Sequence, residues 1–477
     1  MAAKSLMLAD APHLWSLQAS RGTTVHPKSD HGQLAVTKSG YVCEVWSHQT
    51  GANKHIAYAI TKIDLDNPRI RSVVAEGELA ADGTSIYGGG ETCEKPWVSV
   101  LSHATEQFVV TWERQATAAA TTRIEAARIY KNQEGIGFLV DQATAGSIGW
   151  PLDDGVAHGD ADANCRSCYV ADGWFAIGYG TETANVNAAV NERTYSRRHG
   201  LVPWTTAGNP VAGMILKQYT GQHWDDADAN PTIAGGYLLG HLAVTPRGDI
   251  LTVWENRDYD GANFVNTIQY RILAGLYHAT PFATEIETGT ILSYSASAAN
   301  DLLALRRPTL AGLHPELYPA IETEDGYEIM WMVCGREDVD DPENSYAKLI
   351  KLKLYGGGAL QVEHVNWEVN TGPGASAARA KLGSACPFMS RLMSGGIAVA
   401  DFNAGAAGRF LSVQHANGKH ETRRGVTRWP DRPWIEILPL NDGSELALLS
   451  TEGFDEDSGS DDSQRYLEAW KITKEVA

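Results

Sequence analysis

"TPRGDILTVWENRD" at residues 245–258 decides the fold, because it is one copy of a unit that recurs along the chain. The unit is a turn rich in Gly, Pro, Asp or Ser, followed by a run of apolar or alternating residues. A turn followed by alternation with a period of two predicts a β-hairpin strand, and a recurring unit predicts a repeat architecture. The other copies lie at residues 37–46, 104–113, 171–180, 324–333, 392–401 and 441–450.

An aromatic residue ends most copies of the unit. The copies start about 49 to 79 residues apart, so the loops vary in length while the core of the unit persists. Because an aromatic at the same place in every unit can bury a large area against its neighbours, we interpret these side chains as packing residues rather than as a sugar-stacking ring. They are Trp46, Trp112, Tyr179, Trp254, Trp331 and Phe402, and the seventh copy has Leu449 instead.

Each copy extends into further strands on both sides. A short apolar strand precedes it, an alternating strand follows it, and segments such as 69–79 and 135–142 leave room for a fourth strand. Helical spacing is scarce, and residues 300–307 are the best candidate for a short helix. The preceding strands are predicted at 97–102, 237–244, 316–322, 387–392 and 434–440, and the following strands at 55–64, 123–132, 266–273, 347–355, 409–418 and 465–473.

Three or four short strands cannot bury both faces of their sheet, so the units must pack on one another. Seven units packed radially close into a ring, which predicts an all-β fold, a seven-bladed β-propeller at residues 31–477 after an N-terminal arm at 1–30. The last copy leaves no outer strand before Ala477, so we expect residues 13–20 to pair with 465–473 and close the ring. Blade cores are expected near 37–64, 97–132, 169–198, 237–273, 316–355, 387–418 and 434–473.

The repeat cores also carry a resemblance. "QFVVTWERQ" (107–115) and "DILTVWENRD" (249–258) resemble the GGFVVTW-type repeats of bacterial surface and adhesin-like proteins, and β-propeller repeats in general. The resemblance covers the repeat cores over most of the chain; it implies the fold and leaves the function open. The sequence lacks the Asp-box of sialidase-like propellers, since "TEDGYEIMW" (323–331) has its glycine at another position, and it lacks periodic Trp-Asp pairs.

Composition excludes several kinds of partner. The net charge is −19, from 58 acidic and 39 basic residues, without a basic stripe, so we expect no nucleic acid to bind. No run approaches the roughly 18 apolar residues of a membrane span, so no membrane insertion is expected. The N-terminus is a poor secretory signal, because Asp10 and Pro12 interrupt its apolar run. This predicts cytoplasmic synthesis without classical export, although a mature chain that had lost its signal would look the same.

Six scattered cysteines predict no disulfide framework. Cys165 and Cys168 form "CRSC" and, with His158, could begin a zinc site, but a second ligand pair at metal spacing is missing. A second candidate cation site is "FDEDSGSDD" (454–462), whose alternating carboxylates around a glycine could wrap Ca²⁺. It lacks the bidentate Glu of an EF-hand, so a solvated acidic loop is preferred, and the expected cofactor is none or Ca²⁺. The carboxylates concerned are Asp455, Asp457 and Asp461.

Tryptophans outside the repeat position are candidate binding residues. They fall in loop-like, polar or proline-flanked stretches, where an aromatic face could stack on a sugar or anchor the loop. Loop anchoring is at least as well supported as binding. The four residues are Trp150, Trp204, Trp224 and Trp429.

The segment "YSRRHG" (195–200) has the most reactive local composition in the chain. Neighbouring residues on a strand face opposite sides, so its side chains cannot all enter one site, and a surface hairpin is the preferred interpretation. No Gly-x-Ser-x-Gly, Walker loop or His-Glu-x-x-His motif occurs. If the chain is an enzyme, the catalytic candidates are Tyr195, Arg197 and His199, and Arg198, His241 and His278 could join them.

Three functions remain open, because propellers host all of them. The leading hypothesis is a non-enzymatic recognition or assembly module that binds a glycan, a cell surface or a protein partner, in monomeric or oligomeric form. A tail, spike or fibre component of a phage or virus particle would fit this hypothesis. The alternatives are a propeller-type polysaccharide lyase or glycoside hydrolase, and an intracellular scaffold. A deep pocket with converging His, Tyr and Arg would favour an enzyme, and a flat face with exposed Trp would favour binding.

Overall fold

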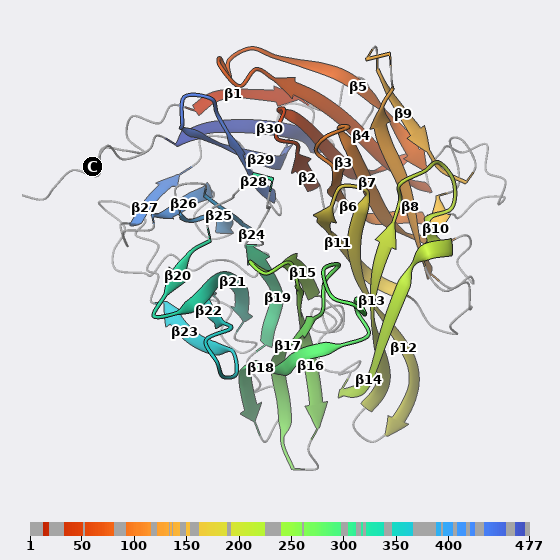
Figure 1. Cartoon of the computed structure of the whole chain (residues 1–477), viewed down its shortest axis with the longest axis vertical. Helices are drawn as coiled ribbons and strands as arrows, with labels where there is room; N and C mark the ends of the chain where they lie inside the picture. The colour runs from red at the N-terminus through yellow and green to blue at the C-terminus, as the bar shows by residue number, and fades with distance from the viewer. Residues whose placement is uncertain are drawn as a thin grey trace, which may run out of the picture.

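Antiparallel β-sheets arranged around a central axis make up the computed structural model of the chain (Figure 1). The turn η1 (Pro210–Gly213) is the only helical element among the residues that the structure describes. No helix long and apolar enough to cross a membrane occurs within them. The described residues are 13–18, 33–50, 53–80, 92–115, 122–132, 134–135, 137–143, 149–152, 162–187, 192–224, 240–259, 262–296, 304–311, 316–317, 321–337, 346–365, 388–392, 395–403, 408–415, 420–424, 434–454 and 463–472.

Three of the sheets are four-stranded meanders whose strands follow one another in the sequence. Each begins at the axis and ends at the outer rim of the ring. Their strands are β11 (Asp162–Ala171), β12 (Trp174–Asn187), β13 (Glu192–Pro203) and β14 (Ile215–Trp224); β15 (Gly240–Val244), β16 (Ile250–Tyr259), β17 (Phe264–Leu273) and β18 (Glu285–Ala296); and β24 (Phe388–Arg391), β25 (Gly396–Asn403), β26 (Gly408–His415) and β27 (His420–Arg424).

The largest sheet has nine strands and consists of two antiparallel halves. A single parallel bridge, between Lys54 and Thr92, joins the halves. Each half has the strand order of a meander, with β9 and the short β10 both pairing with β8 at the edge of the second half. The first half contains β2 (Gln33–Val36), β3 (Tyr41–Thr50), β4 (Asn53–Ile63) and β5 (Arg71–Ala80), and the second contains β6 (Thr92–Ser102), β7 (Gln107–Gln115), β8 (Thr122–Lys131), β9 (Phe138–Asp141) and β10 (Trp150–Pro151).

The five-stranded sheet corrects two sequence predictions. Its inner strand is β19 (Ala304–Ala311), so the predicted helix at 300–307 and the predicted inner strand at 316–322 are both wrong. Pro308 explains the first error, because proline disfavours a helix interior and here coincides with a shift in strand register. The remaining strands are β20 (Thr323–Glu324), β21 (Tyr327–Glu337), β22 (Tyr346–Leu354) and β23 (Gln361–Val365).

The last sheet contains both ends of the described chain. β1 (His13–Gln18) lies antiparallel to β30 (Ser463–Ile472), in the sheet order β1–β30–β29–β28. The indole of Trp15 donates a hydrogen bond of 2.7 Å to the carbonyl of Pro68, which follows β4 in the neighbouring sheet. β1 therefore links the last sheet to the first. The other strands are β28 (Trp434–Pro439) and β29 (Glu445–Phe454).

The innermost strands form a closed circle around the axis. Each contacts the next, as expected when twisted sheets pack face to face in a ring. The all-β propeller architecture predicted from the sequence is confirmed. In order around the axis the inner strands are β2, β6, β11, β15, β19, β24 and β28, and β28 contacts β2 again (Figure 1).

The turn of the opening stretch recurs because its backbone geometry requires glycine. Between β15 and β16, the amide of Gly248 donates to the carbonyl of Thr245 and the amide of Thr245 donates to the carbonyl of Asp249. Gly248 has a φ of 81°, in the left-handed region that favours glycine. The same turn follows the inner strands β2, β24 and β28, and the glycines there are Gly40, Gly395 and Gly443.

The repeated aromatic residues pack between sheets, as predicted. Trp254 is 1% exposed, and its indole lies 6.1 Å from the His199 ring of the preceding sheet. The side chain of Phe402 lies outside the described residues, and Leu449 is buried. Burial of Trp46, Trp112, Tyr179, Trp254 and Trp331, all at most 4% exposed, confirms the packing interpretation.

Candidate functional site

A cavity of about 100 Å³ lies inside the circle of inner strands. Every inner strand contributes to its wall, so the cavity exists only because the sheets form a ring. Much of the wall is aliphatic, which makes its few polar side chains conspicuous. Those side chains are Ser99, Ser167, Cys168, Tyr169, His241, Ser390 and Glu436.

Two tryptophans and a histidine form a central aromatic cluster at one side of the cavity. The rings of Trp97 and Trp434 meet edge to face with centroids 4.6 Å apart, and Trp97 meets His241 in the same way at 5.3 Å. The three residues come from β6, β28 and β15, and Trp434 is the first residue of its strand. Edge-to-face contacts of this kind hold aromatic rings in fixed orientations.

His241 presents a neutral imidazole. Burial lowers its pKa to about 3, and the nearby positive charge of Arg166 adds to the shift. The Leu310 amide donates to His241 Nδ1 over 3.2 Å, so Nδ1 is the acceptor and Nε2 carries the ring hydrogen. The guanidinium of Arg166 lies 4.2 Å from the centroid of the Trp97 ring, a cation–π contact.

Glu436 is the only carboxylate on the described wall of the cavity. Burial inside the ring raises its pKa to about 8, and hydrogen bonds from the side chains of Ser390 and Trp434 only partly oppose the shift. The Ser390 hydroxyl donates to Glu436 Oε2 over 3.3 Å. The side chain keeps part of its surface open to the cavity, yet the surrounding protein still disfavours its charged form. At neutral pH the cavity wall therefore carries a neutral carboxylic acid.

This raised pKa predicts a pH-dependent stability. The folded protein holds a proton on Glu436 up to about pH 8, whereas the unfolded chain releases it near pH 4.3. The free energy of unfolding therefore falls as pH rises, by up to about 1.5 kcal/mol between pH 6.5 and 8. Urea unfolding at both pH values should show this fall in the wild type and a flatter response in Glu436→Gln. Equal slopes in the two proteins would contradict the shift.

Residues after β19 contact the glycine turns of other sheets. Lys38, in the turn after β2, forms an ion pair of 2.7 Å with Glu316, which follows β19. Leu317 is buried in the hydrophobic cluster that includes Leu392 and Leu440, near two other such turns. The segment predicted as an inner strand therefore contributes residues that lie across the axis, joining sheets that are not adjacent in the ring.

The segment proposed as catalytic lies between sheets and away from the cavity. It belongs to β13, and Arg197, Arg198 and His199 are buried, so the predicted surface hairpin is wrong there. Burial lowers the pKa of His199 well below its usual value, and its Nε2 lies 2.8 Å from Thr252 Oγ1 of the next sheet. The side chain of Tyr195 lies outside the described residues.

Glycines explain how the neighbouring arginine fits between two sheets. A Cβ at Gly178 or Gly240 would come within 3.1 or 2.6 Å of Arg197 Nη2. His278 is also away from the cavity, 2.7 Å from Asp249 Oδ1 at the turn after β15. Of the reactive residues named from the sequence, His241 is the one that lines the cavity.

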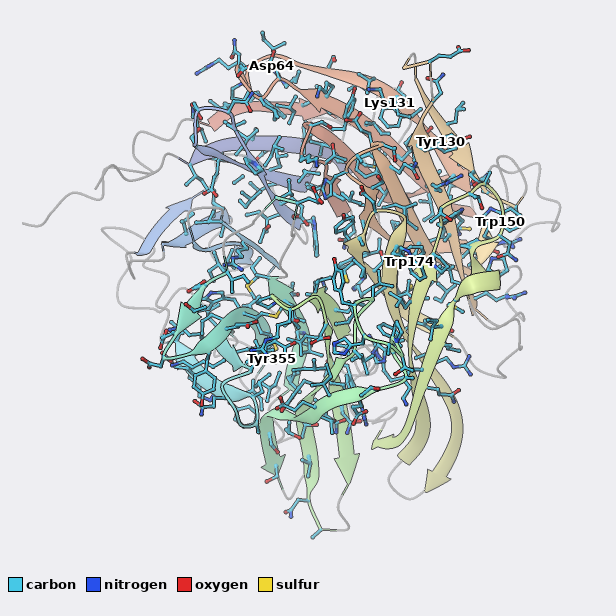
Figure 2. The ribbon with its side chains drawn as sticks, viewed as in Figure 1. Asp64, Tyr130, Lys131, Trp150, Trp174 and Tyr355 are labelled. Carbon is cyan, nitrogen blue, oxygen red and sulfur yellow. The ribbon has the colours of Figure 1, made fainter. Side chains whose placement is uncertain are left out.

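The candidate binding tryptophans divide into packed and partly exposed residues. Trp204 is 2% exposed and lies near Phe175, with ring centroids 6.3 Å apart, so it fits the loop-anchoring alternative. Trp150 is half-buried at the outer rim of the ring, where its indole donates to Asp141 Oδ1 over 3.3 Å (Figure 2). The side chain of Trp224 and all of Trp429 lie outside the described residues.

The candidate metal sites gain no support from the described residues. Asp455, Asp457 and Asp461 lie outside them. Cys165 and Cys168 are free thiols, and burial raises the pKa of each to about 12. No group of three or more His, Cys, Asp or Glu side chains suited to a metal ion occurs in the described part of the chain.

Comparisons with known proteins give distant structural similarities. No family model matches the sequence, and no curated protein does. The crystal structure of the polysaccharide lyase Uly1 matches with a TM-score of 0.46 and 11% identity, over 93% of this chain and 91% of that one. The α-L-arabinofuranosidase Arb93A from Fusarium graminearum matches with a TM-score of 0.40 and 9% identity, over 78% and 91% of the two chains. Kuenenia stuttgartiensis hydrazine synthase matches with a TM-score of 0.40 and 9% identity, over 96% of this chain and 99% of that one. At these scores the similarities carry no functional argument.

Proposed function

We propose that the chain is a seven-bladed propeller in which β1 closes the ring. The single bridge between Lys54 and Thr92 supports counting the nine-stranded sheet as two blades. The closed circle of seven inner strands supports the same count. The pairing of β1 with β30 supports closure, because the last blade then gains its outer strand from the N-terminus.

For the function, we propose a recognition module that binds its ligand in the central cavity. The observation that carries this proposal is the convergence of neutral hydrogen-bonding groups on a cavity beside two tryptophans. The Glu436 carboxyl, the His241 imidazole and the serine hydroxyls offer donors and acceptors without a fixed charge. Apolar walls with a few convergent polar groups are typical of small-molecule sites, and this combination suits part of a hydroxyl-rich ligand such as a glycan.

A second candidate, a polysaccharide lyase or glycoside hydrolase, is favoured by one observation. A carboxylic acid with a pKa near 8 can act as a general acid at neutral pH. A glycoside hydrolase of the usual kind needs a second carboxylate beside the scissile bond, and the described wall of the cavity contains only Glu436. His241 Nδ1 accepts a hydrogen bond from the Leu310 amide, so the other ring nitrogen, Nε2, carries a hydrogen and can donate but cannot act as a base. Recognition without cleavage is therefore the better-supported function.

A panel of neutral, acidic and amine-bearing polysaccharides tests both candidates. We expect the full chain to be retained on at least one polymer without shortening it, and we expect Glu436→Gln to lose retention at least tenfold. Leu139→Ala, at an exposed residue of the outer strand β9, is the control and should bind as the wild type does. Polymer shortening that disappears in Glu436→Gln would favour the enzyme. Polymer retention that is unchanged in Glu436→Gln would show that the ligand does not bind in the central cavity.

A further inference from the structure

Within the described part of the chain, the Glu436 carboxyl has no countercharge in an ion pair. The side chains that shift its pKa by hydrogen bonding, Ser390 and Trp434, are both neutral. Among the described residues, no lysine or arginine forms an ion pair with it. A carboxyl enclosed by protein is usually paired with a cation or kept for a functional purpose. The geometry of the cavity indicates which kind of ligand could supply the missing cation.

We propose that the cavity is a binding site for a primary ammonium group, held between the Glu436 carboxylate, the cavity serines and the tryptophan rings. An ammonium has three N–H donors and no acceptor. The Glu436 carboxylate and the hydroxyl oxygens of Ser99, Ser167 and Ser390 supply acceptors in the lining of the cavity. Ser99 and Ser167 already lie together, with their oxygens 2.7 Å apart.

The aromatic walls suit a cation as well. Tryptophan faces attract cations more strongly than other aromatic rings do, and the attraction grows when water is excluded. The Arg166 guanidinium already lies 4.2 Å from the centroid of the Trp97 ring, so Trp434 is the tryptophan that a ligand cation would meet. Trp434 packs edge to face on Trp97 and also lines the cavity. The ligand ammonium would therefore meet Glu436 and Trp434, two positions apart on β28.

Size and charge favour the same class of ligand. A cavity of about 100 Å³ is below the roughly 300 Å³ of pockets that enclose drug-sized ligands, so it suits a head group with its carrier outside. The net charge of −19 attracts cations over long range and repels polyanions. Because the inference rests on the proposed function, it narrows the ligand to a hydroxyl-rich molecule with a free amine, such as an amino sugar.

Binding should release a proton. Glu436 is protonated at neutral pH before a ligand binds, and the ammonium requires the carboxylate, so the carboxyl proton leaves to solvent as the ligand enters. Of the strands that contact β28, β24 carries Arg391 and β29 carries Glu445. The charged Arg166 guanidinium lies against Trp97, and the titratable groups on the cavity wall besides Glu436 are His241, Cys168 and Tyr169. Burial keeps these wall groups neutral across pH 6–8, so Glu436 is the group that changes charge there.

Titration calorimetry of the full chain with methylammonium chloride tests the inference. Methylammonium stays charged to about pH 10, as lysine does. Heats measured at pH 7 in two buffers of different ionisation enthalpy should reveal release of about one proton per site. The affinity should rise about ninefold from pH 6 to 7 and about fivefold from pH 7 to 8, because the fraction of ionised Glu436 rises by those factors when its pKa is about 8. Methanol, the uncharged isostere, and sodium chloride are the controls.

Two variants sharpen the result. Glu436→Gln should lose methylammonium binding at least tenfold while keeping its urea-unfolding transition, and Leu139→Ala, at an exposed residue of β9, should behave as the wild type. Saturable binding with proton release in the wild type supports the inference even if Glu436→Gln fails to fold. Absence of binding, binding without proton release, or equal binding of methanol would overturn it. Methylammonium carries no sugar, so a negative result would overturn the ammonium site without deciding whether the protein binds glycans. The polysaccharide panel tests glycan binding separately.

Discussion

Replacing Trp112 by alanine is expected to lower the free energy of unfolding by about 3–5 kcal/mol, as for other buried tryptophans. Trp112 stands at the repeated aromatic position of β7 and is completely buried. A Cβ at Gly149 would come within 2.5 Å of its ring, and the Ala126 carbonyl oxygen lies close to the same point. Since backbone atoms border the ring there, the surroundings cannot collapse into the space that alanine would leave.

Urea unfolding monitored by circular dichroism measures this loss. Trp150→Ala is the matched control, because Trp150 belongs to the same sheet but is only half-buried at its edge. Trp150→Ala should lower the free energy of unfolding clearly less than Trp112→Ala does. Equal losses in the two variants, or a Trp112→Ala loss below about 1 kcal/mol, would mean that the repeated aromatic does not stabilise the packing between blades.

The hairpins could be predicted from the sequence because their determinants are local. Gly248 enables the turn, alternation defines the strand, and Trp254 ends it within a few residues. The inner strand of the five-stranded sheet was missed because its sequence lacks this pattern. Pro308 interrupts β19, and the apolar residues of 316–322 gave a better strand signal although Leu317 packs across the axis.

The site was harder to predict because it depends on the ring. Trp97 and Trp434 are distant in sequence and meet only when the first and last sheets come together around the axis. Glu436 looks like the polar residue of a half-exposed strand, but both faces of an inner blade strand are covered. A sequence signal did exist, since two inner strands, β6 and β28, each carry a tryptophan directly before a β-branched apolar residue.

The segment around His199 was predicted to be a surface hairpin, but its described side chains are buried. Two arginines and a histidine in succession indicate a surface, because such side chains are seldom buried. In the ring they lie between two blades, where the small residues Gly178 and Gly240 make room for Arg197 and where Thr252 contacts His199. Burial between blades cannot be inferred from one strand alone.

Deleting residues 1–18, which removes β1, is expected to have the largest effect on stability in the protein. Trp15 is 5% exposed, its indole donates to the Pro68 carbonyl, and the guanidinium of Arg71 lies 4.5 Å from its ring centroid. Loss of this side chain alone should cost about 3–5 kcal/mol, and loss of the backbone pairing with β30 adds to that cost. The deletion also leaves β30 as an open edge, which favours self-association.

Deletion of residues 1–12 is the control, because it ends just before β1 and keeps the whole strand. We expect that protein to unfold at the wild-type urea concentration and to elute as the wild type does in size-exclusion chromatography. The longer deletion should unfold at much lower urea and form larger species. If both deletions behave alike, β1 does not close the ring, and the first and last blades must hold together through other contacts. The buried hydrogen bond from Ser450 to Glu44, which joins the same two sheets, would then be the first contact to remove.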